Sequence, residues 1–118
     1  MIDNGRIRME SYKGVLYCEA YMNDEFSVED LESMINEIRK NYNSNSDVIL
    51  KKVGTYSVSP DVQLKLSKKI KEFRNFVYLV DNGVKKASAE YAAASYMSPY
   101  NTRVASTKEE AFAMLGNL

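Results

Sequence analysis

The run Phe76-Val-Tyr-Leu-Val80, followed at once by Asp81-Asn-Gly83, decides the fold class. It is the most apolar run in the chain, and a short run of this kind predicts a central strand that is covered on both faces. Asp, Asn and Gly tolerate left-handed backbone conformations, so they predict a tight turn where this strand ends. The pattern indicates a layered protein with a strand at its centre.

Helical patterns lie on both sides of this strand. Ser59 followed by Pro60 is a strong helix start, because serine caps a helix and proline fits its first turn. The apolar stripe of that helix consists of Val62, Leu66, Ile70 and Phe73. Residues 84–97 are helical by composition. Strands that alternate with helices predict parallel neighbours joined by right-handed crossovers.

The same alternation extends toward the N-terminus. Residues 48–53 predict a further strand, and the helix before it begins at Ser27, with Asp30 completing an approximate capping box. Residues 6–10 and 15–22 alternate between apolar and polar side chains around a short loop that contains glycine. Two such runs predict a β-hairpin.

The C-terminal end supplies one more strand and helix. Thr102 to Ala105 predicts a short last strand, and Thr107 with Glu110 forms a capping box for a terminal helix. The order is therefore ββαβαβαβα. We expect a single α/β domain over residues 1–118, with a mixed sheet of about five strands and about four helices.

Composition excludes several classes of protein. The 118 residues are 45% hydrophobic and 27% charged with a formal net charge of zero, which is typical of a globular protein and not of a dedicated nucleic-acid binder. No apolar run is long enough to span a membrane, and the N-terminus lacks the apolar core of a signal peptide. We expect no nucleic-acid partner, no membrane partner and a cytoplasmic location.

The residue types present also limit the catalytic and metal-binding sites that the chain could form. The chain has no histidine and a single cysteine, Cys18, which excludes Ser-His and Cys-His catalytic pairs and a structural zinc site within one chain. Cys18 lies in an apolar stretch and is expected to be a small core residue. We therefore expect no metal, no cofactor and no enzymatic activity.

The C-terminal segment Arg103-Val-Ala-Ser-Thr-Lys-Glu-Glu-Ala-Phe-Ala-Met-Leu115 resembles the closing strand and helix of the STAS (sulfate transporter and anti-sigma-factor antagonist) family, which has the SpoIIAA-like fold. The element order resembles this family over nearly the whole chain, and the similarity is greatest to small stand-alone bacterial members. The resemblance implies a STAS-like regulatory module.

In anti-sigma-factor antagonists, a serine or threonine at the start of the helix after the third strand is phosphorylated by a partner kinase. The matching stretch here is Gly54-Thr-Tyr-Ser-Val-Ser-Pro-Asp61, so the resemblance implies phosphorylation or anion binding at Ser57 or Ser59. The Asp and Gly that usually flank the phosphorylated residue are missing. The alternative role of Ser59 is that of a helix cap.

Two surfaces are candidates for binding. Tyr56, Asp81 and Asn82 form a candidate ligand or partner surface, because ligands of open α/β sheets bind beyond the carboxyl ends of the strands. The alternative is that the residues at 81–83 only form a turn. Tyr17 and Tyr21 share one strand face and form a candidate homodimer surface, because tyrosine is enriched at interfaces. The alternative is that they are core tyrosines covered by a helix.

The function expected from these observations is that of a non-enzymatic STAS-like interaction or regulatory module. We expect it to associate with itself as a homodimer and to bind a regulatory protein partner. The alternative is a protein that binds a small ligand, either a lipid or a nucleotide, because lipid-carrier folds resemble STAS domains in architecture. A carrier requires an apolar cavity.

Overall fold

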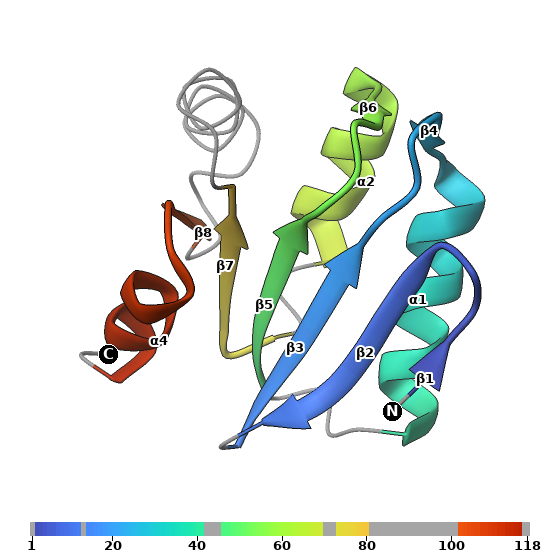
Figure 1. The fold of residues 1–118 in the computed structure, drawn as a ribbon. Coiled ribbons are helices and arrows are strands. Elements are labelled where there is room, and N and C mark those ends of the chain that lie inside the picture. The colour runs from blue at the N-terminus through green and yellow to red at the C-terminus, as the bar shows by residue number, and fades with distance from the viewer. Residues whose placement is uncertain (1, 13, 42–45, 70–72, 81–101, 117–118) are drawn as a thin grey trace.

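The computed structural model describes residues 2–12, 14–41, 46–69, 73–80 and 102–116, which form a large sheet, a small sheet and three helices (Figure 1). The strands of the large sheet are β1 (Ile2–Asp3), β2 (Ile7–Tyr12), β3 (Val15–Ala20), β5 (Asp47–Lys52), β7 (Asn75–Leu79) and β8 (Thr102–Ala105). The small sheet consists of β4 (Glu25–Phe26) and β6 (Ser57–Val58), and the helices are α1 (Val28–Asn41), α2 (Pro60–Lys69) and α4 (Lys108–Gly116).

The large sheet has the strand order β1-β2-β3-β5-β7-β8. β1, β2 and β3 are antiparallel neighbours, whereas β3, β5, β7 and β8 run parallel. The predicted α/β class with a mixed sheet and an N-terminal hairpin is confirmed. The predicted number of about five strands is too low, since β1 adds a sixth strand and β4 and β6 form a second sheet. The predicted helix over 84–97 lies outside the described residues.

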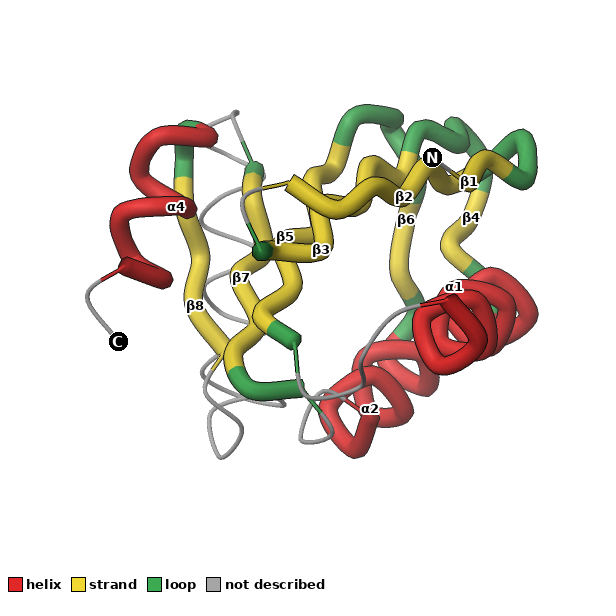
Figure 2. The backbone as a smooth tube through the Cα atoms, turned by 90° about the horizontal axis from the view of Figure 1, so that it is seen from below, coloured by secondary structure: helices red, strands yellow, loops and turns green. Residues whose placement is uncertain are grey.

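Helices cover both faces of the sheet. α1 and α2 pack side by side on one face, and α4 packs on the other against β7 and β8 (Figure 2). The crossovers that contain α1 and α2 both step in the same direction along the sheet. Because such crossovers are right-handed, two steps in one direction place both helices on the same face.

The alternation predicted for the second hairpin strand is confirmed. Leu16, Cys18 and Ala20 point into the core under α1 and α2, while Val15 and Tyr17 point into the core under α4. Cys18 is fully buried, as expected, and burial raises the pKa of its thiol to about 12. A thiol in this environment stays protonated at neutral pH.

The helix starts follow their capping residues. The Ser27 hydroxyl accepts a hydrogen bond from the Asp30 backbone N–H at 3.2 Å, and the Asp30 carboxylate accepts one from the Ser27 backbone N–H at 2.9 Å. This is the predicted capping box. The second helix begins at Pro60 as predicted and is described to Lys69. Ile70 of the predicted stripe lies outside the described residues. Phe73 is buried in the same core as Val62 and Leu66, as predicted, although its own backbone is not helical.

Candidate functional site

The carboxyl ends of β3 and β5 lie next to each other and lead into a second, smaller pairing. After β3 the chain continues through β4 into α1, and after β5 it continues through β6 into α2 (Figure 1). β4 and β6 pair in parallel, with Glu25 opposite Ser57 and Phe26 opposite Val58. This pairing holds the segments 21–27 and 53–59 against each other beyond the edge of the main sheet. The region where ligands of α/β proteins bind is therefore built from two fixed segments.

Residues 53–57 alternate between exposed and buried positions. Val53, Thr55 and Ser57 are exposed, whereas Gly54 and Tyr56 between them are buried. The backbone N–H groups of Val53 and Gly54 both donate to the Ala20 carbonyl, at 2.9 and 3.1 Å. We call Val53, Thr55 and Ser57 the exposed strip. Its base is fixed by the buried positions and by hydrogen bonds to the segment after β3.

Further polar contacts hold the strip in place. The backbone N–H and the hydroxyl of Thr55 both donate to the Asn23 side-chain oxygen, at 3.1 and 3.2 Å. The Ser57 backbone N–H donates to the Asp24 carbonyl at 3.3 Å. Because these bonds join residues that are far apart in sequence, the conformation of the strip depends on the tertiary fold and not on a local preference for a turn.

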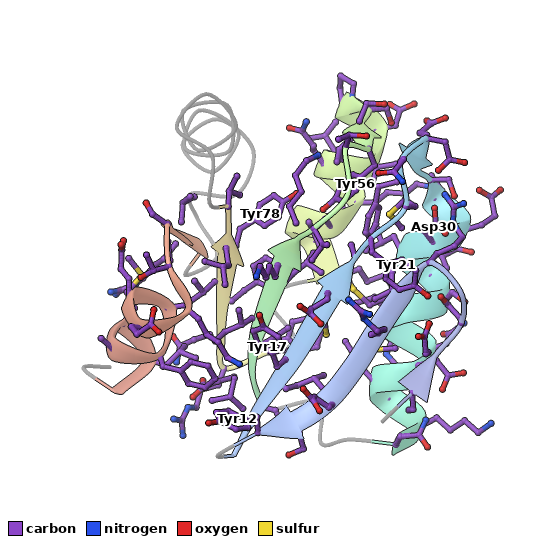
Figure 3. The ribbon with its side chains drawn as sticks, in the orientation of Figure 1. Tyr12, Tyr17, Tyr21, Asp30, Tyr56 and Tyr78 are labelled. Carbon is purple, nitrogen blue, oxygen red and sulfur yellow. The ribbon has the colours of Figure 1, made fainter. Side chains whose placement is uncertain are left out.

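Tyr56, in the segment of the strip, pairs with Tyr78 of β7 in the core under α1 and α2 (Figure 3). The hydroxyls of Tyr56 and Tyr78 are 2.8 Å apart, and the Tyr56 ring contacts Phe26 with centroids separated by 5.5 Å. The Lys52 ammonium lies 3.6 Å from the centroid of the Tyr56 ring and donates a hydrogen bond to the Tyr56 carbonyl. Tyr56 therefore anchors the strip through an apolar contact, a cation–π contact and a hydroxyl pair.

The two tyrosine hydroxyls do not ionise at neutral pH. Burial raises the pKa of Tyr56 far above its usual value, and the neighbouring Tyr78 raises it further. Burial also raises the pKa of Tyr78 to about 12, with the hydrogen bond between the two hydroxyls acting in the opposite direction. Neither hydroxyl is therefore suited to act as a general base, because such a base needs a pKa near the working pH.

The anchoring role of Tyr56 yields a stability prediction. Replacing Tyr56 with phenylalanine keeps the ring contacts and removes the hydroxyl pair, which leaves the Tyr78 hydroxyl without its partner. We expect the free energy of unfolding to fall by about 1 kcal/mol, measured by urea denaturation. Tyr12→Phe is the matched control, since the Tyr12 side chain is exposed. Equal effects of the two substitutions would contradict the anchoring role.

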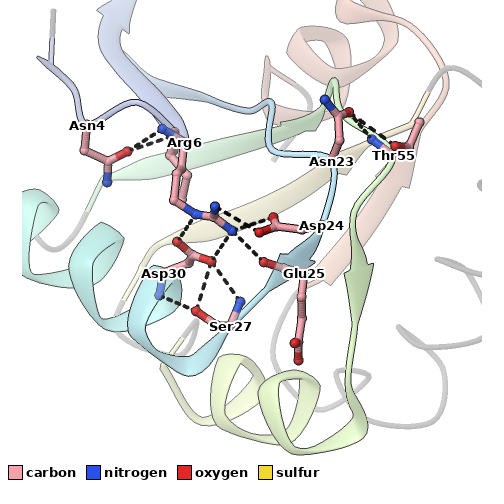
Figure 4. A network of polar contacts seen from close by, with 9 residues as sticks. Asn4, Arg6, Asn23, Asp24, Glu25, Ser27, Asp30 and Thr55 are labelled. Carbon is pink, nitrogen blue, oxygen red and sulfur yellow. Dashed lines mark hydrogen bonds and ion pairs between the residues drawn. The ribbon is translucent and has the colours of Figure 1, made fainter.

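An ion network joins the start of β2 to the start of α1 (Figure 4). The Arg6 guanidinium donates to the carboxylates of Asp30 and Asp24, each at 2.7 Å, and to the Glu25 carbonyl at 2.8 Å. The hydrogen bond from Arg6 lowers the pKa of Asp24 to about 2. Burial favours a raised pKa for Asp30, but hydrogen bonds from Arg6 and Ser27 outweigh it and lower the pKa. Both carboxylates are therefore occupied by ion pairs with Arg6.

The structure places the two predicted serines differently. Ser57 is exposed on β6, while Ser59 is half-buried and its hydroxyl accepts a hydrogen bond from the Val62 backbone N–H at 3.3 Å. Ser59 is thus the helix cap of the alternative interpretation. Tyr56 is next to Ser57 in sequence but is buried, so it does not belong to a ligand or partner surface as predicted. Asp81 and Asn82 lie outside the described residues.

The predicted dimer surface needs correction. The Tyr17 ring is only 4% exposed and stacks on Phe112 of α4, with centroids 6.4 Å apart. It is therefore a core tyrosine covered by a helix, as in the alternative interpretation, and is not available to a second chain. Tyr21 lies just after β3 and remains half-buried. Its hydroxyl donates to the Asp3 carboxylate.

Sequence reasoning missed several residues that build this region. Lys52, Asn23 and Thr55 carry no motif, and the partners of Arg6 are 18 and 24 residues away. The pattern at 53–57 did offer a signal, because Gly54 and Tyr56 are spaced two apart like the inward positions of a strand. The sequence prediction assigned this stretch to a loop, whereas the structure contains the short strand β6.

Comparisons with known proteins return no match to a family model, and no significant match to a curated protein or to a solved structure. Within the described ranges, no group of three or more acidic or cysteine side chains is placed to hold a metal ion. The helices of that part of the chain are also too short or too polar to cross a membrane.

Proposed function

We propose that the chain is a non-enzymatic, STAS-like protein-interaction module that binds a regulatory protein partner through the exposed strip and the helix after it. The observation that carries the proposal is the alternation at 53–57, which directs Val53, Thr55 and Ser57 outward from a fixed base. A surface that is already ordered loses little conformational entropy when it binds, so more of its contact energy appears as affinity.

The composition of the surface supports a protein partner. Val53 is 44% exposed and Leu64 of α2 is 45% exposed, and with Tyr12 they are the large exposed hydrophobic side chains of the described residues. Polar and charged groups accompany them, namely Thr55, Ser57 and the exposed lysines Lys65 and Lys68. Exposed apolar side chains among polar ones are typical of protein interfaces.

Ionisable groups near the strip support binding over catalysis. Asp24 and Asp30 are held by Arg6, and the hydroxyls of Tyr56 and Tyr78 stay protonated at neutral pH. A general acid or base must exchange a proton near the working pH. The arrangement of these groups therefore favours a structural role for each.

We infer that the phosphorylation implied by the STAS resemblance falls on Ser57 and not on Ser59. The Ser57 side chain is exposed, whereas the Ser59 hydroxyl caps α2. A phosphate on Ser57 would add a charge of about −2 to the strip and change its complementarity to the partner. Peptide mapping of protein purified from its own cells tests this, and phosphate on Ser59 instead would contradict it.

The first experiment compares partner binding by the wild-type chain and by surface variants. The tagged full-length chain is purified gently from its own cells, and native and denatured masses are recorded on the same sample. We expect a co-purifying protein whose yield falls at least about tenfold in Val53→Asp and in Leu64→Lys, because a charge replaces a buried apolar contact. A retained lipid or nucleotide would instead favour the alternative of a small-ligand carrier.

The matched control is Ala113→Lys, which introduces a charge at an exposed position on α4, on the other face of the sheet. We expect this variant to retain the partner. Retention of the partner by both Val53→Asp and Leu64→Lys would contradict the proposed surface. Purification of the wild-type chain without any protein partner would contradict the proposed function.

A further inference from the structure

Four charged side chains form a row across the face of the sheet that carries α4. The strand register pairs Asp3 with Arg8, Arg8 with Glu19, and Glu19 with Lys51, on β1, β2, β3 and β5. Directly paired residues share a face of the sheet. Glu19 is two positions from Tyr17, which contacts α4, and so lies on that same face. This charged row alternates acid, base, acid and base.

The part of the sheet that bears the row is accessible. α4 packs over β7 and β8 at one side of this face (Figure 1). Its Phe112 side chain also reaches over Tyr17 of β3 and Tyr12 of β2, at the hairpin end of these strands. The row crosses β2 and β3 near their opposite end, where Arg8 pairs with Glu19. Arg8 and Glu19 form an ion pair at 3.4 Å, with their side chains 39% and 27% exposed. The Arg8 guanidinium also lies over the Tyr21 ring, 4.7 Å from its centroid. Tyr21, from the predicted dimer surface, therefore belongs to this face.

The Arg8 guanidinium retains hydrogen-bonding capacity. Within the described ranges, its Nε atom is buried and has no hydrogen-bond partner, which is uncommon in a folded protein. The side chain as a whole is 39% exposed, and its ion pair with Glu19 is long, at 3.4 Å. An acidic side chain that approaches the row from outside would bind the exposed end of the guanidinium and not the buried Nε atom.

We propose that this face binds a second copy of the chain, with the twofold axis running along the strands between β2 and β3. A twofold interface brings the same surface of both copies together, so the surface must complement itself. Rotation about this axis reverses the order of the row. Arg8 then faces the partner's Glu19, and Lys51 faces the partner's Asp3. An alternating row with an even number of members is self-complementary under this reversal and only under it, because an axis along the row would oppose like charges.

The position of α4 fits this arrangement. Reversal places β1 of one copy over β5 of the other, so α4 over β7 and β8 stands beyond the partner's β1 edge. Packed sheets lie about 10 Å apart, and a helix with its side chains is about 10 Å thick. The backbone of α4 can therefore flank the second sheet, whereas its Phe112 side chain fills the space over Tyr12 and Tyr17 at the hairpin end. The two sheets meet at the end that carries the row and diverge toward the hairpins. The strands of the two sheets would run nearly parallel, as in aligned sheet packing.

Sedimentation velocity of the full-length chain over a concentration series tests the proposal. We expect wild-type dimers, and in Arg8→Glu or Glu19→Arg alone we expect the dimer dissociation constant to rise at least about 30-fold, because each variant opposes like charges twice. Mixing the two variants should restore dimers. In the mixed dimer, position 8 of each chain faces an opposite charge at position 19 of the other, although the ion pair within each chain stays broken.

Rescue by mixing separates the proposal from a structural role of the ion pair. Glu32→Lys on the exposed face of α1 is the control and should leave the dimer unchanged. Monomers of the wild-type chain at every concentration, dimers that persist in both single variants, or a mixture that stays monomeric would each overturn the proposal. If circular dichroism shows that either variant is unfolded, Asp3→Lys mixed with Lys51→Glu provides the same test. Because the exposed strip is a separate surface, Val53→Asp leaves this measurement unaffected.

Discussion

Replacing Gly54 with alanine is expected to lower the free energy of unfolding by about 3 kcal/mol or more, which corresponds to a fall in melting temperature of roughly 12 °C. A Cβ atom on Gly54 would lie 1.8 Å from the Met22 carbonyl oxygen and 2.8 Å from the Tyr21 carbonyl carbon. Both neighbours are backbone atoms. A flexible side chain could rotate away from such a contact, but a peptide group cannot.

The only relief would be separation of the two segments that carry the candidate site. Gly54 and Val53 both donate hydrogen bonds to the Ala20 carbonyl, and movement away from Met22 would break them. We therefore expect the alanine variant to lose the geometry of the exposed strip together with stability. Thermal unfolding followed by circular dichroism measures the stability change.

Gly116→Ala is the matched control for this prediction. Nothing lies within 4 Å of the position that a Cβ atom would take at Gly116, and its backbone needs no positive φ. We expect a change in the free energy of unfolding below about 0.5 kcal/mol for the control. If Gly54→Ala melts at the same temperature as Gly116→Ala, the close approach of the two segments is wrong.

Local signals in the sequence were enough to predict most of the regular structure. Ser27, Ser59 and Thr107 each mark the start of a helix that the structure contains, because a capping side chain acts on backbone groups only three residues away. The alternation of apolar residues in β3 likewise predicted which side chains face each core. These features depend on near neighbours and can be read without knowledge of the tertiary structure.

The candidate site depends on contacts between distant segments, and those were missed. β4 and β6 have two residues each, too few for an alternating pattern to predict their pairing, so the pairing forms only because the crossovers lie side by side. Tyr17 was assigned to an open face because nothing near it in sequence shows that Phe112 covers it. The role of Arg6 was missed for the same reason. The sequence predicted the layers, whereas the surface between them follows from tertiary packing.

Removing the carboxylate of Asp30 is expected to be the second most damaging substitution. The side chain is only 7% exposed, and it accepts hydrogen bonds from Arg6, at 2.7 and 3.1 Å, and from Ser27. Asp30→Ala removes the capping box of α1 and leaves the Arg6 guanidinium without its main buried partner. We expect the free energy of unfolding to fall by about 2 to 3 kcal/mol at pH 7, measured by urea denaturation.

The pH dependence of this loss identifies its cause. The pKa of Asp30 is lowered in the folded chain, while in the unfolded chain it is near 3.9. A carboxylate with a lowered folded pKa contributes stability that is complete above the unfolded pKa and is lost as the pH falls through the folded pKa. The difference between wild type and Asp30→Ala should therefore be largest at pH 5 to 7 and should shrink below about pH 4.

Asp61→Ala is the matched control, because Asp61 occupies the first turn of α2 but is exposed. We expect it to change the free energy of unfolding by less than about 0.5 kcal/mol. Asp30→Asn separates charge from shape: it keeps a hydrogen-bond acceptor at the capping position and should lose about half as much stability as the alanine variant. A loss in Asp30→Ala that is as large at pH 2.5 as at pH 7 would show that the cost comes from packing. In that case the ion network would not be what fastens α1 to β2. It would also not be what fixes the segment 21–27, to which the exposed strip is hydrogen-bonded.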